Sequence, residues 1–101
     1  MNEKELIVKA LKKVFAKNKI NLKDEEILKL IEIPPSQDMG DFAFPCFVLA
    51  KFLKKNPKDI AIKLREDIDE TGFEDVQTLG AYLNFFVNRE KFAWQMIKQI
   101  L

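Results

Sequence analysis

The sequence has no histidine, a single cysteine and only three glycines. Without histidine, the Ser-His and Cys-His nucleophilic arrangements and most metal sites are excluded. Neither a P-loop nor a Gly-x-Gly-x-x-Gly element is present, since the chain has so few glycines. The carboxylates mostly stand near lysines at helical spacing, which is typical of a solvated surface. We therefore expect no catalytic residue and no metal site in these 101 residues.

Further absences concern the cellular setting of the chain. The single Cys46 cannot form an internal disulfide, which fits a reducing compartment. No apolar run approaches the roughly 20 residues that a membrane-spanning helix needs, and the Lys/Glu-rich beginning does not resemble a signal peptide. A net charge of +1 provides no overall attraction to nucleic acid or membrane. These features predict a cytoplasmic protein without membrane contact, in which local patches would have to bind any polyanion.

The composition favours one folded domain over residues 1–101. Hydrophobic residues make up 48% of the chain and charged residues 33%, as in ordinary soluble globular proteins. A chain of this length buries about two-thirds of the surface of its unfolded state. Nine phenylalanines predict a core rich in aromatic rings.

Periodicity predicts two helices in the first half of the chain. Apolar residues recur at helical spacing over residues 3–17, and lysines cover the remaining face. A second helix is expected over residues 42–54, with Asp41 as its N-cap and Cys46 on its inner face. On that face, Cys46 is interpreted as a core residue rather than a nucleophile.

Two more helices are predicted in the second half. Asn56-Pro57 combines a capping side chain with a proline at the first helical position, and the helix is expected to end near Gly72. The last helix is expected over residues 92–101. Because its apolar face runs to the final residue, we expect the natural polypeptide to continue.

Three segments predict strands. Leu28 and Leu30 alternate with Lys29, so residues 28–33 read as a short strand closed by two prolines. In an alternative, a half-turn of helix over residues 23–28 precedes that strand. Residues 73–79 and 82–87 flank Gly80-Ala81 and predict a β-hairpin. The expected fold is therefore α+β, in the order α-β-α-α-β-β-α, with a small antiparallel sheet packed by about four helices.

The second hairpin strand carries an unusual polar pair. Strand alternation places Leu83 and Phe85 on one face and Tyr82 and Asn84 on the other. A phenol ring beside a carboxamide can hold a flat heterocycle, the ring by stacking and the amide by hydrogen-bonding the edge. Such a pair is also often no more than a half-buried aromatic and a solvated amide, and the spacing alone leaves both interpretations open.

Two groups of lysines could contact a polyanion. One brackets the corner between the second and third predicted helices, and the other lines the first helix. A solvated surface explains either group by itself, whereas lysines near an exposed aromatic–amide pair would favour phosphate contacts. The members are Lys51, Lys54, Lys55 and Lys58 in the first group, and Lys9, Lys12, Lys13, Lys17 and Lys19 in the second.

An ordered set of short motifs resembles the N-terminal additional domain of arginyl-tRNA synthetases. Each motif is weak alone, but their order and spacing cover nearly the whole chain. The motifs are Ile31-Glu32-Ile33-Pro34-Pro35, Met39-Gly40-Asp41-Phe42-Ala43, Leu49-Ala50-Lys51, Asn56-Pro57-Lys58-Asp59-Ile60-Ala61 and Gly80-Ala81-Tyr82-Leu83-Asn84-Phe85.

The resemblance implies a four-stranded antiparallel sheet packed by helices, with the fourth strand near residues 23–30 or after Gly72. It also implies a domain that holds the elbow of an arginine-specific tRNA by recognising a D-loop base. The family's aromatic and amide positions for that contact fall on Tyr82 and Asn84. Some members carry a polar residue directly before the motif's glycine, where this sequence has Leu79.

The resemblance also assigns the chemistry to another part of the family's polypeptide. The family's catalytic signatures are absent here, and its His-containing nucleotide motif cannot exist in a chain without histidine. The expectation is an accessory domain of an ATP-dependent arginine–tRNA ligase, in which ATP and arginine are bound by a separate catalytic domain.

Two alternatives remain at this point. The chain could be a protein-interaction or oligomerisation module that uses Tyr82 and Phe86 or the surface around Trp94. It could also be a single-strand RNA binder of the RRM kind, although the second aromatic strand of that fold is missing. Added salt should abolish RNA binding but leave an apolar protein interface intact.

Overall fold

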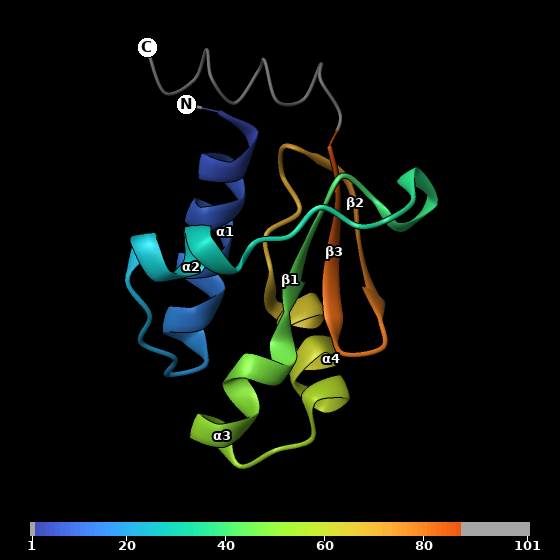
Figure 1. Ribbon diagram of the computed structural model, residues 1–101. Coiled ribbons are helices and arrows are strands. Elements are labelled where there is room, and N and C mark those ends of the chain that lie inside the picture. Colours follow the sequence, from blue (N-terminus) through green and yellow to red (C-terminus); the bar gives the residue numbers. More distant parts are fainter. Residues whose placement is uncertain (1, 88–101) are drawn as a thin grey trace, which may run out of the picture.

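The computed structural model describes residues 2–87, so the predicted helix over 92–101 and Trp94 lie outside the described residues. The fold is α+β, as predicted (Figure 1). Its elements, in chain order, are α1 (Glu3–Lys17), α2 (Asp24–Leu30), the 3-10 turn η1 (Gln37–Met39), β1 (Phe42–Pro45), the 3-10 turn η2 (Cys46–Leu49), α3 (Ala50–Leu53), α4 (Pro57–Asp67), β2 (Phe73–Leu79) and β3 (Tyr82–Val87).

An antiparallel sheet in the order β1-β3-β2 forms the centre of the domain. The predicted hairpin is confirmed with the predicted bounds, and β3 is its central strand. Within residues 2–87 the sheet has three strands. The fourth strand expected near residues 23–30 or after Gly72 is not among them. Beyond the first of these places, Glu32 makes an isolated bridge to Ala43, with two backbone hydrogen bonds of 2.8 Å.

The predicted strand over residues 28–33 is wrong, because the first half of this segment belongs to helix α2 (Asp24–Leu30). Three acidic residues occupy the first turn, where they interact favourably with the helix dipole. The side chain of Glu26 also accepts a hydrogen bond from the backbone N–H of Lys23, at 3.2 Å. The alternative with a half-turn of helix over residues 23–28 is closer to the structure. The capping at its start favours a helix more strongly than the alternation around Lys29 favours a strand.

The predicted helix over residues 42–54 is also wrong in its first part. Phe42–Pro45 forms β1, and only Ala50–Leu53 is α-helical, after the η2 turn. Pro45 has no N–H for a helix and sits at the end of an edge strand, where proline is tolerated. Asp41 is consequently not an N-cap; its carboxylate accepts a hydrogen bond from the N–H of Val87, at 2.8 Å.

Cys46 is fully buried, as predicted, although it lies in η2 rather than on a helix face. Burial raises the pKa of its thiol to about 12, and a backbone hydrogen bond involving Leu83 offsets this only in part. The thiol is therefore protonated at neutral pH and behaves as a small apolar core group.

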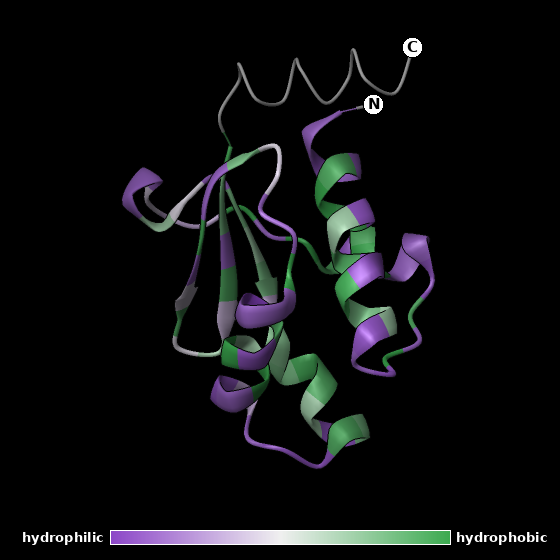
Figure 2. Ribbon diagram, turned by 180° about the vertical axis from the view of Figure 1, so that it is seen from behind, coloured by the Kyte–Doolittle hydropathy of each residue, from purple (hydrophilic) through white to green (hydrophobic). Residues whose placement is uncertain are grey.

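The core lies between the sheet and the helices α1 and α4. Two aromatic pairs contribute to it: Phe15 meets Phe44 at 5.5 Å between ring centroids, and Phe73 meets Phe85 at 5.2 Å. In Figure 2, which views the molecule from behind, α4 lies in front of the sheet. Apolar and polar stretches alternate along α1 in the same view. No helix within residues 2–87 is long and apolar enough to cross a membrane.

The start of α4 is confirmed. The side chain of Asn56 accepts a hydrogen bond from the N–H of Lys58 at 2.9 Å, and Pro57 occupies the first helical position. The helix ends at Asp67, earlier than Gly72, because the backbone of Ile68 is extended.

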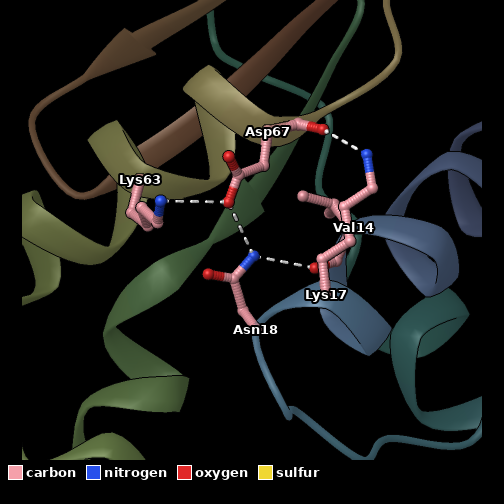
Figure 3. Close-up of polar contacts among 5 residues, drawn as sticks. All are labelled: Val14, Lys17, Asn18, Lys63 and Asp67. Atoms are coloured by element: carbon pink, nitrogen blue, oxygen red, sulfur yellow. Dashed lines mark hydrogen bonds and ion pairs between the residues drawn. The ribbon is translucent and has the colours of Figure 1, made fainter.

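A polar cluster joins the C-terminal ends of α1 and α4 (Figure 3). The amide nitrogen of Asn18 donates to the carbonyl of Val14 at 2.9 Å and to the carboxylate of Asp67 at 3.2 Å. Lys63 approaches the same carboxylate at 3.4 Å, and Lys17 donates to the carbonyl of Asp67. The hydrogen bond from Asn18, followed by the charge of Lys63, lowers the pKa of the Asp67 carboxyl.

This cluster predicts a pH-dependent contribution to stability. A carboxyl with a lowered folded-state pKa stabilises the fold above its unfolded-state pKa of about 3.9, and the contribution disappears as the pH falls through the folded-state value. We expect Asp67→Asn to lower the free energy of unfolding more at pH 7 than at pH 2. Urea denaturation at several pH values measures the difference.

Glu66→Gln is the matched control, because this exposed neighbour on α4 loses the same charge without a hydrogen-bonded partner in the described range. It should leave the stability unchanged at both pH values. If Asp67→Asn were equally destabilising at pH 2 and pH 7, the charge of Asp67 would not be the cause.

Candidate nucleic-acid interface

The two faces of β3 differ in the way that alternation predicted. Leu83 and Phe85 are fully buried in the core. Tyr82 and Phe86 are half-buried on the opposite face, and Asn84 lies between them with only 3% of its surface exposed. Within residues 2–87, Asn84 is the only buried residue with a polar side chain. Asn84 is therefore not a solvated amide, which was one of the two interpretations that the sequence left open.

Asn84 and Tyr82 line the same cavity, which has a volume of about 350 Å³. The connection between α2 and β1 provides the opposite wall, and in Figure 1 this connection crosses the sheet. Most of the lining is apolar, with one carboxylate. The lining residues are Glu32, Ile33, Pro34, Pro35, Met39, Ala43, Leu79, Tyr82 and Asn84.

The carboxamide of Asn84 offers a hydrogen-bond acceptor to a ligand. Its nitrogen donates to the carbonyl of Met39 at 2.6 Å, and this bond fixes which way the amide points. Its oxygen is buried and has no hydrogen-bond partner among the described residues. Leaving such an acceptor unpaired costs about 1–3 kcal/mol. A ligand that donates a hydrogen bond to this oxygen would remove that cost.

Gly40 and Asp41 hold the cavity wall against β3. The N–H of Asp41 donates to the carbonyl of Phe85 at 2.9 Å, and its carboxylate accepts from Val87. Gly40 has a φ of +99°, and a Cβ at this position would lie 2.8 Å from the same carbonyl oxygen. Only glycine allows this approach, which brings the carbonyl of the preceding Met39 to Asn84.

The ring of Tyr82 is positioned by Phe47, which sequence reasoning missed. The two rings meet edge to face, with centroids 5.6 Å apart and planes at 87°. Pro45 pairs with Tyr82 in the sheet, so the η2 turn that follows brings Phe47 to Tyr82. No local signal could reveal the contact, because it depends on the pairing of β1 with β3.

The first lysine group lies beyond this end of the sheet. Lys51, Lys54, Lys55 and Lys58 are exposed on α3, the α3–α4 connection and the first turn of α4. No acidic partner is within ion-pair distance of these four among residues 2–87.

The second group is partly occupied by structural contacts. Lys12 pairs with Asp24 at 3.4 Å and donates to the carbonyl of Leu22, while Lys17 donates to the carbonyl of Asp67. The first group is thus the freer of the two to contact a polyanion. In the described part of the chain, no group of three or more acidic or cysteine side chains could hold a metal ion.

Comparisons with known proteins identify the family. The solved arginyl-tRNA synthetase of Thermus thermophilus shares this fold: the match covers 93% of this chain and 15% of that one, with a TM-score of 0.74 and 24% identity. A family model described as the arginyl tRNA synthetase N terminal domain matches residues 2–87. The chain belongs to this family, which confirms the resemblance carried by the sequence motifs.

Curated relatives show how much of a longer protein this domain represents. An arginine–tRNA ligase of Clostridium perfringens is 48% identical over the full 101 residues, which make up 17% of that protein. One of Clostridioides difficile is 52% identical over 82 residues, or 14% of its length. These 101 residues thus correspond to the N-terminal domain of such a ligase and do not include the catalytic domain.

The geometry at Gly40 predicts a large cost for adding a methyl group. Gly40→Ala would have to relieve both the contact with the carbonyl of Phe85 and the positive φ. We expect it to lower the free energy of unfolding by about 2–3 kcal/mol. Thermal or urea denaturation measures the change.

Gly80→Ala is the matched control, since Gly80 has a φ of +60° but no atom within 4 Å of an added Cβ. Conformational strain alone should cost about 1 kcal/mol there. Equal losses at both positions would show that the wall is not pressed against β3 as the structure has it.

Proposed function

We propose that this domain binds an arginine-specific tRNA at its elbow by taking an unpaired D-loop base into the cavity of Tyr82 and Asn84. The observation that carries the proposal is the buried oxygen of Asn84, which has no partner in the described range and belongs to a residue that lines an open cavity. Buried polar atoms in proteins are almost always paired, and an exception at a cavity wall indicates a missing partner.

The shape and lining of the cavity suit a flat heterocycle. Its volume of about 350 Å³ lies within the range of small-molecule pockets, roughly 300–1,000 Å³. Tyr82 would stack on the base, and Ile33 and Pro34 supply apolar surface on the connection that forms the other wall. Base–aromatic stacking of this kind contributes about 1–3 kcal/mol.

The side-chain oxygens left unpaired among the described lining residues favour a base edge that donates hydrogen bonds. The nitrogen of Asn84 is already bonded to Met39, so the amide would read the base as an acceptor only. Glu32, which also lines the cavity, is a second acceptor and would repel a phosphate. An exocyclic amino group, as in adenine, cytosine or guanine, satisfies both requirements.

The lysines Lys51, Lys54, Lys55 and Lys58 would then contact phosphates outside the cavity. They are exposed, without acidic partners among residues 2–87, and lie beyond the end of the sheet at which Tyr82 sits. Phosphate contacts position a nucleic acid while base contacts specify it, so binding should weaken steeply with added salt.

The parent activity forms the remaining part of the proposal. The relatives are named arginine–tRNA ligases, and this domain would hold the tRNA for a catalytic domain that joins arginine to it with ATP. ATP and arginine would bind to that catalytic domain and not to the residues described here. A cytoplasmic location follows from this role, and the lone, buried Cys46 is consistent with a reducing compartment.

The proposal predicts which substitutions weaken tRNA binding. Tyr82→Ala removes the stacking ring and should weaken binding about 5- to 150-fold, whereas Tyr82→Phe should have little effect. Asn84→Leu removes both the unpaired acceptor and the hydrogen bond to Met39 at similar volume, so its two effects on stability oppose each other, and it should weaken binding about tenfold. Fluorescence anisotropy of a labelled arginine tRNA at low salt measures each affinity.

Gln77→Ala is the control for the amide, because Gln77 pairs with Asn84 across the sheet but does not line the cavity. It should bind tRNA like the unmodified chain. Unchanged affinity in both Tyr82→Ala and Asn84→Leu would refute base recognition in this cavity.

An interaction module remains the second candidate, because several exposed apolar side chains surround the cavity. Ile33 is 73% exposed, and Met39, Phe47 and Leu79 are also exposed. Phe86 is half-buried rather than an open contact residue. A protein interface here would persist or strengthen in high salt, under conditions that release tRNA.

A further inference from the structure

Phe52 is the most exposed large hydrophobic residue among those described, at 77% of its surface. It lies on α3 and lines a hollow of about 220 Å³ with the connection between α1 and α2. That connection contributes Lys19, Ile20, Asn21 and Leu22, and Figure 1 shows it beside α3. Tyr82 and Asn84 do not line this hollow, so it is separate from the cavity of the proposed base site.

A second hollow, of about 210 Å³, adjoins the first because Ile20 and Leu53 line both. Its rim includes Lys55 and Lys63, together with one acidic residue, Asp59. Lys63 is paired with Asp67, whereas Lys19 and Lys55 have no acidic partner in residues 2–87. We call the two hollows together the α3 groove. It combines an apolar floor, an exposed aromatic ring and two free cations.

Two lysines at the α3 groove have an unusual backbone conformation. Lys19 and Lys54 are the only non-glycine residues with positive φ in the described range, at 58° and 53°. Lys19 lines the groove, and Lys54 lies between Leu53 and Lys55, which also line it. Glycine is the usual residue at such left-handed positions after a helix. The chain therefore keeps two lysines beside the groove where glycine would be less strained.

We propose that the α3 groove is a second RNA-binding site, which takes an unpaired nucleotide of the same tRNA. The base stacks on Phe52, and the flanking phosphates contact Lys19 and Lys55. The positive rim favours a polyanion over an apolar protein segment, and an exposed aromatic ring between cations is the arrangement that holds single-stranded nucleic acid. This site rests on the proposed function in that both contacts belong to one tRNA.

One short segment contacts both a residue of the base cavity and the groove. Phe47, in η2, contacts Tyr82, while Phe52, five residues later in α3, lines the groove. The segment of η2 and α3 thus connects two aromatic contacts, and Lys51, Lys54 and Lys55 come from its second half and the turn that follows. A tRNA bound at both sites would lie close to this segment at Phe47 and at Phe52.

Phe52→Ala tests the stacking contact in the 101-residue chain. The side chain is exposed, so the melting temperature should not fall, and the affinity for an arginine tRNA should fall about tenfold. Ile62→Ala is the control, because Ile62 is an exposed apolar residue of α4 that does not line the groove. It should bind tRNA normally.

Lys19→Gly tests the charge. Glycine suits the positive φ, so the melting temperature should stay the same or rise, while the slope of log affinity against log salt should fall by about 0.7–0.9. Lys29→Ala, which removes an exposed lysine of α2 outside the groove, should change neither value. Loss of stability in Lys19→Gly would indicate a structural lysine and count against the site.

The outcomes separate this site from the base cavity. Weaker binding in Phe52→Ala with normal binding in both Tyr82→Ala and Asn84→Leu supports the groove and refutes the base cavity. Normal binding in Phe52→Ala overturns the groove, whatever Tyr82→Ala does. Equal effects of Lys19→Gly and Lys29→Ala, or an effect of Phe52 on self-association in high salt rather than on RNA, would likewise overturn it.

Discussion

The placement of residues 40–41 against the backbone of β3 is the constraint on which the site depends. Two hydrogen bonds join Asp41 to Phe85 and Val87, and the missing side chain of Gly40 allows the close approach. This contact brings the carbonyl of Met39 to the nitrogen of Asn84. The amide oxygen is then left as a buried acceptor without a partner in the described range, in a residue that lines a cavity. A pair of residues that would otherwise be ordinary becomes a candidate reader of a base.

Much of the fold follows from local sequence signals. Asn56-Pro57 starts α4 because the cap and the fixed φ of proline act within one turn, and Gly80 marks the hairpin turn. The prediction of a helix from residue 42 is wrong, because it rested on Cys46, Leu49 and Leu53 at helical spacing and on an expected N-cap before residue 42. The pairing of Phe42 and Phe44 with β3, some 40 residues away, makes the first part of the segment a strand, and a local pattern contains no record of that pairing.

The same limit applies to the candidate site. Alternation correctly placed Tyr82 and Asn84 on the face opposite the core, and the family motif singled out the same two residues. The sequence could not show that Asn84 is buried, that its nitrogen donates to Met39, or that Phe47 positions Tyr82. Each of these facts comes from a contact between segments that are distant in sequence. Sequence therefore indicated which residues to consider, and the structure indicates which atoms remain free to bind.

The central claim is that the free oxygen of Asn84 accepts a hydrogen bond from a base of an arginine tRNA. The most direct measurement is an amide-resolved NMR titration of the chain at low salt with an arginine tRNA and, separately, with a tRNA of another specificity. The account predicts shifts centred on Tyr82, Asn84 and Met39 that are larger for the arginine tRNA. Shifts confined to lysines and equal for both RNAs would contradict it.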